Sequence, residues 1–233
     1  VRVPKALRNK FKSGLDFVDC ALGGEGFTPS QVLLFTGTPG AGKTTMMLTL
    51  ADQITKSGGL VVFNTAEESL FQVKLIAERL GLKSGFAVGQ ETHVPTLLEA
   101  CDKLRAKRGN KNKPFFLIVD SLQCMDDGKY ANGSVNSQSA TRALALITDY
   151  CKEQFVNAIV IGQVNKEGKM SGSNKLKHMV DAMITLSVEE KDPDLRGCRV
   201  LQTTKNRFGG CGHTFFLALN GTGFTEVARV SAA

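Results

Sequence analysis

The chain has 233 residues, of which 42% are hydrophobic, which is enough to build one α/β domain with a complete core. No apolar run is long enough to cross a bilayer, and no hydrophobic segment follows the charged N-terminus, so we expect neither a membrane-spanning helix nor a signal peptide. The formal net charge of +7 favours a polyanionic partner.

Strands and helices alternate along the chain, which predicts an α/β fold with a mostly parallel central sheet and helices on both faces. The last three predicted strands have no helices between them and indicate an antiparallel C-terminal extension. Two polar stretches, 121–137 and 163–177, are interpreted as long loops, either functional or mobile, that follow strand ends. Strands are expected at 31–36, 60–65, 115–120, 157–162, 182–188, 198–204 and 213–219, and helices at 43–56, 69–80, 95–108 and 138–154.

The segment between the first predicted strand and the first predicted helix fits the phosphate-binding loop pattern. Glycines there let backbone N–H groups turn inward around phosphate oxygens, and the helix that follows adds its positive N-terminal end. Lys43 is expected to reach the β- and γ-phosphates of ATP, and the Thr44 hydroxyl to ligate Mg²⁺. The predicted ATP-binding residues are Gly37, Thr38, Pro39, Gly40, Ala41, Gly42, Lys43, Thr44 and Thr45.

A second magnesium ligand is predicted at the end of the strand at 115–120. Five apolar residues there are followed by Asp120, whose carboxylate is expected to hold the water shell of Mg²⁺. Gln163 ends another predicted strand, where its amide either senses the γ-phosphate or only hydrogen-bonds a loop.

Two adjacent acids, Glu67 and Glu68, follow the strand at 60–65. Because neighbouring residues of an extended chain point apart, we expect only one of them to enter the site and orient the attacking water. The other is expected to cap the helix that starts near Ser69. The alternative is that both acids only favour that helix N-terminus through its dipole.

Basic residues gather in three clusters. The first lies in the N-terminal segment 1–14, and the second covers 103–113, which we interpret as a solvated surface. The third lies in a Gly/Ser-rich stretch and is interpreted as a DNA-binding loop. Neither the second nor the third cluster is interleaved with the aromatic residues that would make a stacking platform for bases. The lysines of the third cluster are Lys166, Lys169, Lys175 and Lys177.

Several further segments carry a family resemblance. The runs Leu22-Gly-Gly24, Ala66-Glu-Glu-Ser69 and His178-Met-Val-Asp181, and above all Lys205-Asn-Arg-Phe-Gly209, resemble the corresponding blocks of RecA-type ATPases. The similarity is strongest to the bacterial RadA (Sms) branch-migration family, and it spans roughly residues 12–219.

The resemblance implies a RecA-like P-loop NTPase core that forms a hexameric ring around single-stranded DNA, with ATP between subunits. It implies that Glu67 is the catalytic glutamate and that Lys205 and Arg207 approach the γ-phosphate bound by a neighbouring subunit. The remaining matches are Lys43, Thr44 and Asp120 at the nucleotide and Mg²⁺ positions, and Gln163 where the family more usually has histidine.

Compared with that family, the sequence shows neither the N-terminal zinc module nor the C-terminal protease-like domain. We therefore interpret 1–233 as a single ATPase domain. The six cysteines form no C-x-x-C pair, so we expect no zinc site and a reduced, cytoplasmic protein without membrane association. The predicted function is an ATP-hydrolysing DNA motor in recombination, repair or replication, acting by helicase or branch-migration activity. The alternative is a RecA-fold ATPase of clock or signalling type that acts on protein partners.

Overall fold

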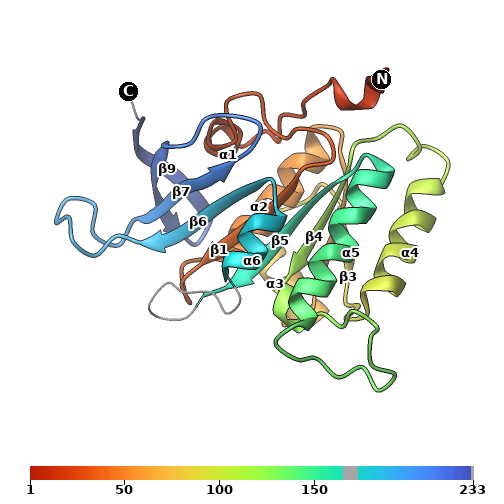
Figure 1. The fold of residues 1–233 in the computed structure, drawn as a ribbon. Helices are drawn as coiled ribbons and strands as arrows, with labels where there is room; N and C mark the ends of the chain where they lie inside the picture. The colour runs from red at the N-terminus through yellow and green to blue at the C-terminus, as the bar shows by residue number, and fades with distance from the viewer. Residues whose placement is uncertain (165–172, 232–233) are drawn as a thin grey trace.

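A computed structural model describes residues 1–164 and 173–231 and shows one sheet with helices on both faces (Figure 1). The helices are α1 (Asp16–Ala21), α2 (Lys43–Lys56), α3 (Leu70–Arg79), α4 (Val94–Ala106), α5 (Ser139–Gln154) and α6 (Ser173–Met179), with single 3₁₀ turns η1 (Lys5–Leu7) and η2 (Leu122–Cys124). The strands are β1 (Val32–Gly37), β2 (Leu60–Thr65), β3 (Ala87–Gly89), β4 (Phe115–Asp120), β5 (Asn157–Gln163), β6 (Ala182–Val188), β7 (Arg199–Asn206), β8 (Thr214–Asn220) and β9 (Gly223–Val230).

The strand order is β3-β2-β4-β5-β1-β6-β7-β8-β9, and the pairs from β3 to β6 are parallel. The strands β7, β8 and β9 continue the sheet in antiparallel pairing, which confirms the predicted extension. It begins one strand later than expected, because β6 pairs in parallel with β1 and α6 supplies the crossover that parallel pairing requires. The short strand β3 and the final strand β9 were not predicted.

Two apolar layers cover the sheet. On one face, α1, α2 and α3 pack through residues such as Met46 and Val73. On the other face, α4, α5 and α6 pack through residues such as Leu97 and Ile147. β4 is buried along its whole length, because helices cover both faces of the sheet. A strand that is covered on both faces needs apolar side chains on both, which explains the continuous apolar sequence of β4. No helix in the described residues is both long and apolar enough to span a bilayer.

The interpretation of 163–177 as one continuous loop is wrong. Residues 173–179 form α6, which packs against α5 and buries Leu176. Lys175 and Lys177 are exposed on this helix. Lys166 and Lys169 lie outside the described residues. Tertiary packing on α5 through Leu176 and Met179 stabilises this short helix, and the polar composition of the segment conceals it.

The end of α5 has an unusual backbone. Its C-cap residue, Phe155, has φ 55° and ψ 41°, in the left-handed region. Glycine is the usual residue at such a helix end, because a Cβ there costs roughly 1–2 kcal/mol. Phe155 is 43% exposed, so only part of the ring packs against the rest of the protein.

Candidate nucleotide-binding site

The glycine-rich loop lies at the carboxyl end of β1 and leads into α2. Gly42 has φ 97°, and a Cβ there would approach Leu219 and Phe224 to 3.0 Å. At Gly37, a Cβ would lie 2.6 Å from the carbonyl oxygen of Leu186. Glycine is therefore required at both positions, because the backbone conformation and the neighbouring β6 and β8–β9 leave no room for a side chain.

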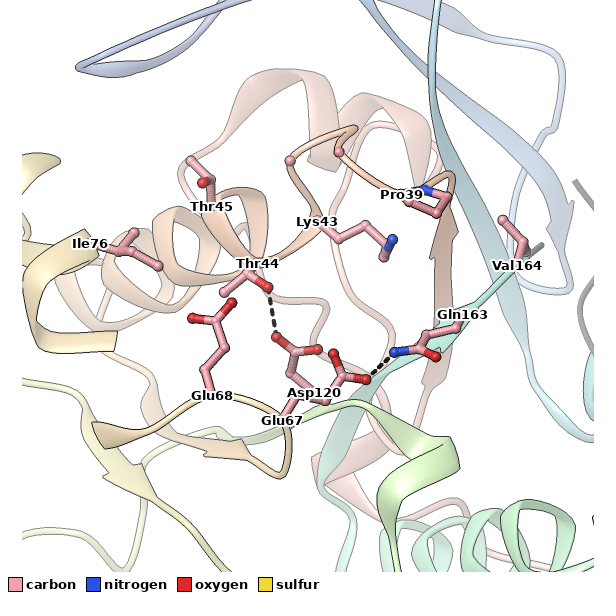
Figure 2. Close-up of a pocket in the computed structure, with 12 residues that line it drawn as sticks. Pro39, Lys43, Thr44, Thr45, Glu67, Glu68, Ile76, Asp120, Gln163 and Val164 are labelled. Carbon is pink, nitrogen blue, oxygen red and sulfur yellow. Dashed lines mark hydrogen bonds between the residues drawn. The ribbon is translucent and has the colours of Figure 1, made fainter. Parts of the chain in front are cut away.

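Lys43 is the first residue of α2 and lies over the loop. Its Nζ donates to the carbonyl oxygens of Gly37 at 2.9 Å and Thr38 at 3.3 Å. Burial lowers the pKa of Lys43, whereas the carboxylates of Asp120 and Glu67 act in the opposite direction. The ammonium group borders a cavity of about 460 Å³ that the loop and three other strand ends enclose (Figure 2).

Thr44 and Asp120 meet on the floor of this cavity. The Thr44 hydroxyl donates to Asp120 Oδ2 at 2.8 Å, as the dashed line in Figure 2 shows. Asp120 is only 3% exposed, and burial raises its pKa to about 6, with Glu67 and Glu68 adding to the rise and the Thr44 hydrogen bond opposing it. A hydroxyl and a carboxylate side by side are the oxygen ligands that Mg²⁺ prefers, so this pair fits the predicted metal position.

Glu67 is held by side chains from two other strand ends. Its Oε1 accepts a hydrogen bond from Ser121 Oγ at 2.5 Å and another from the side-chain amide of Gln163 (Figure 2). Cys124 Sγ lies 3.5 Å from the same oxygen. Residues at the carboxyl ends of β2, β4 and β5 therefore converge on the Glu67 carboxylate beside Asp120.

The expectation for the acidic pair was wrong in two respects. Both Glu67 and Glu68 line the cavity, and neither caps α3. Ser69 is the cap, in a capping box in which Ser69 Oγ accepts from the Gln72 backbone at 3.2 Å and Gln72 Oε1 accepts from the Ser69 backbone at 2.9 Å. The chain bends after Ala66, so the alternation of an extended strand does not apply there. Burial and the charge of Glu67 raise the pKa of Glu68.

Lys205 and Arg207 lie toward the amino ends of the parallel strands, whereas the cavity lies at their carboxyl ends. Lys205 pairs with Met183 near the start of β6, whereas the glycine-rich loop is level with Leu186 near its end. Lys205 Nζ donates to the carbonyl oxygen of Lys177 in the last turn of α6 at 2.9 Å and to that of Val180, just after α6, at 2.8 Å. Arg207 is ion-paired with Asp181 at 2.9 Å. Both cations are thus outside the cavity of their own chain.

Two residues at the site were missed by sequence reasoning. Arg199 of β7 donates to the carbonyl oxygens of Ala41 at 3.3 Å and Gly40 at 3.4 Å, which ties the phosphate loop to the antiparallel extension. No local pattern marks it, because the contact joins distant segments. Ser121, which holds Glu67, directly follows Asp120, and that position after a strand end was a signal that could have been used.

The fold is the RecA-like α/β fold, and the cavity carries the glycine-rich loop that is typical of P-loop proteins. The chain is similar to a solved chain of a DnaB-like replicative helicase with TM-score 0.80 and 15% identity, over 94% of this chain and 62% of that one. It is similar to the ATPase domain of G40P with TM-score 0.78 and 16% identity, over 96% and 93%. It also resembles the KaiC-like protein PH0186 from Pyrococcus horikoshii OT3 with TM-score 0.71 and 20% identity, over 94% and 99%.

Sequence similarity is more specific. The chain is 31% identical over 221 residues to the DNA repair protein RadA of Aquifex aeolicus, covering 94% of this chain and 47% of the relative. It is 33% identical over 224 residues to RadA of Haemophilus influenzae, covering 96% and 46%. No family model matches the chain. The protein is homologous to the RadA DNA repair proteins over nearly its whole length, and it spans about half the length of these relatives.

Proposed function

We propose that this chain is an ATP-hydrolysing motor that assembles as a hexameric ring and moves on single-stranded DNA in recombination, repair or replication. The observation that carries the proposal is the convergence of Lys43, Asp120 and Glu67, from three separate segments, on one cavity beside a glycine-rich loop. Stimulation of the ATPase rate by single-stranded DNA is the test that separates a DNA motor from other ATPases of this fold.

Several polar residues of the cavity have roles in phosphoryl transfer. The backbone of residues 37–45 and the Lys43 ammonium bind the phosphates, and Thr44 and Asp120 are the ligands for Mg²⁺, whose charge stabilises the phosphate oxygens when it is bound. Glu67 accepts a hydrogen bond from the attacking water and orients it toward the γ-phosphate. Gln163 contacts the Glu67 carboxylate and thereby links the site to the chain that follows β5.

The ring part of the proposal follows from the position of Lys205 and Arg207. Cations at the far edge of the sheet cannot stabilise charge in their own cavity, but in a ring they would face the cavity of the next subunit. Arg207 would have to leave Asp181, and its side chain is half-exposed and able to do so. A cation supplied in trans stabilises the transition state only after assembly.

Mixing two inactive variants is expected to restore part of the ATPase rate. One variant carries Lys205→Ala and Arg207→Ala, and the other carries Lys43→Ala. In a mixed ring, some interfaces pair an intact Lys43 with an intact Lys205 and Arg207, and those interfaces can turn over. Subunit exchange is checked by fluorescence energy transfer. Exchange without any recovery of the ATPase rate would contradict catalysis in trans.

Loss of the third basic cluster is expected to weaken DNA binding and flatten its salt dependence. Each phosphate contact removed lowers the slope of log K against log salt by about 0.7 for single strands. Binding of a labelled oligonucleotide is titrated at several salt concentrations, and an unchanged slope would remove this cluster from the DNA interface. The tested residues are Lys166, Lys169, Lys175 and Lys177, and the matched control removes the exposed lysines Lys74, Lys83, Lys152 and Lys191.

A RecA-fold ATPase of clock or signalling type, which acts on a protein partner, is the second candidate. The likeness in fold to the KaiC-like protein from Pyrococcus horikoshii favours it. The two candidates differ in one measurement, because only the DNA motor predicts that single-stranded DNA raises the rate of ATP turnover.

A further inference from the structure

A second cavity, of about 430 Å³, lies at the amino ends of the parallel strands β4 and β5, opposite the nucleotide site. The N-terminal segment, the connection between α4 and β4, and the end of α5 surround it, and Figure 1 shows these three segments together at the top of the view. Phe115 and Asn157, the first residues of β4 and β5, contribute to its lining and are buried. We call it the basic cleft.

All the charged side chains among the described residues that line the basic cleft are positive. It is lined by Lys10, Lys111, Lys113 and Arg105, and none of the described residues that line it is Asp or Glu. Arg105 is partly neutralised by Asp102, at 3.4 Å. The three lysines are exposed and form no ion pair within the part of the chain that the structure describes. They come from two basic clusters that are far apart in the sequence, and the fold brings them to one cavity.

An exposed aromatic ring stands among these cations. Phe155 lines the cleft and is 43% exposed, although it occupies a left-handed position where glycine would be free of strain. A large apolar side chain that is strained and largely exposed contributes little to the stability of the folded state. Strain of this kind is concentrated at binding and catalytic sites. Phe155 is therefore better explained by a ligand than by the core.

We propose that the basic cleft binds a single strand of nucleic acid, with Lys10, Lys111 and Lys113 contacting phosphates and Phe155 stacking on a base. Single-strand sites combine a positive groove with aromatic platforms, and the cleft has both. The inference goes beyond the proposed motor, because the cleft lies at the opposite end of the parallel strands from the nucleotide cavity and its lining includes no described lysine of the third basic cluster. The basic cluster at 103–113 was interpreted as a solvated surface because it ends a predicted helix just before a strand, and Phe155 lies far from it in the sequence.

The substitution Phe155→Gly separates binding from folding. Glycine relieves the strain at this left-handed position, which offsets the packing lost with the half-exposed ring, so the melting temperature should stay close to that of the wild type. The affinity for an oligothymidylate should nevertheless fall about tenfold, because a base–aromatic stack is lost. A merely structural role for Phe155 predicts the reverse, namely lower stability with unchanged affinity, and that result would overturn the proposal.

Two lysines test the phosphate contacts. Lys111→Ala combined with Lys113→Ala should lower the salt slope of oligonucleotide binding by about 1.4, since each contact contributes about 0.7. The control pair, Lys83→Ala with Lys191→Ala, removes the same charge from exposed positions outside the cleft and should leave the slope unchanged. An equal effect of both pairs would mean general attraction to a polyanion and would overturn a specific site.

Photo-crosslinking places the base directly. An oligonucleotide with 5-iodouracil, irradiated in complex with the full chain, should give a cross-linked peptide that contains Phe155. If the wild-type chain binds no DNA, the proposed motor fails together with the cleft. If it binds DNA but no cross-link reaches Phe155 and the cleft variants bind as wild type does, only the inference about the cleft fails.

Discussion

Replacing Glu67 with glutamine is expected to stop ATP hydrolysis while ATP binding is retained. The amide keeps the shape of the side chain and can still be held by Ser121, but it cannot accept a proton from the attacking water. Loss of such a group typically lowers the rate by about 10²–10⁴-fold. Single-turnover hydrolysis and the affinity for a fluorescent ATP analogue measure the two effects separately.

Glu68→Gln is the matched control for this prediction. The two acids are adjacent and line the same cavity, but Glu67 alone contacts Ser121 and Gln163. Glu68 lies toward Thr44 and Thr45 in Figure 2, away from Gln163. Glu68→Gln should therefore keep most of the turnover. An inactive Glu68→Gln together with an active Glu67→Gln would reverse the assignment of the two acids.

Replacing Lys43 with alanine should have the second large effect, a fall of at least about 10²-fold in ATP turnover. The Lys43 ammonium lies against the phosphate loop. A preorganised charge that stabilises the transferring phosphoryl group raises the rate of turnover by this factor or more. Steady-state release of phosphate measures the loss. Wild-type turnover in this variant would refute the location of the site.

Lys43→Ala also removes the hydrogen bonds to Gly37 and Thr38, so loosening of the loop must be separated from loss of charge. Lys43→Arg keeps the charge but cannot place a compact ammonium between the phosphates, and we expect it to be nearly as inactive. Thermal melting shows whether either variant unfolds. Lys83→Ala, an exposed lysine outside the cavity, should turn over ATP as the wild type does.

Much of the site could be predicted because parallel strands end at the same edge of a sheet. The glycine-rich loop follows β1, Asp120 ends β4 and Gln163 ends β5, so local patterns alone indicated that these residues meet. The helix at 43–56 and the strand at 115–120 were predicted with their observed bounds, because long apolar runs and glycine-rich turns are strong local signals.

Other features needed contacts between distant segments. The orientation of Glu68 into the cavity depends on bends after β2, and the helix at 173–179 depends on burial of Leu176 against α5. The contact of Arg199 with the phosphate loop depends on the pairing of β6 with β7. The helix and the Arg199 contact cannot be read from a local pattern, because the partner that stabilises each of them lies elsewhere in the chain.

By itself, the sequence determined the class of chemistry, since the spacing of Gly37, Lys43 and Thr44 is dictated by the size of a phosphate chain and by the start of one helix. The tertiary structure alone decided which charges act together. It grouped Lys10 with Lys111 and Phe155 at one edge of the sheet, and it placed Lys205 beyond the reach of its own nucleotide cavity. Local geometry is encoded over a few residues, whereas electrostatic and stacking surfaces depend on which segments the sheet order brings side by side.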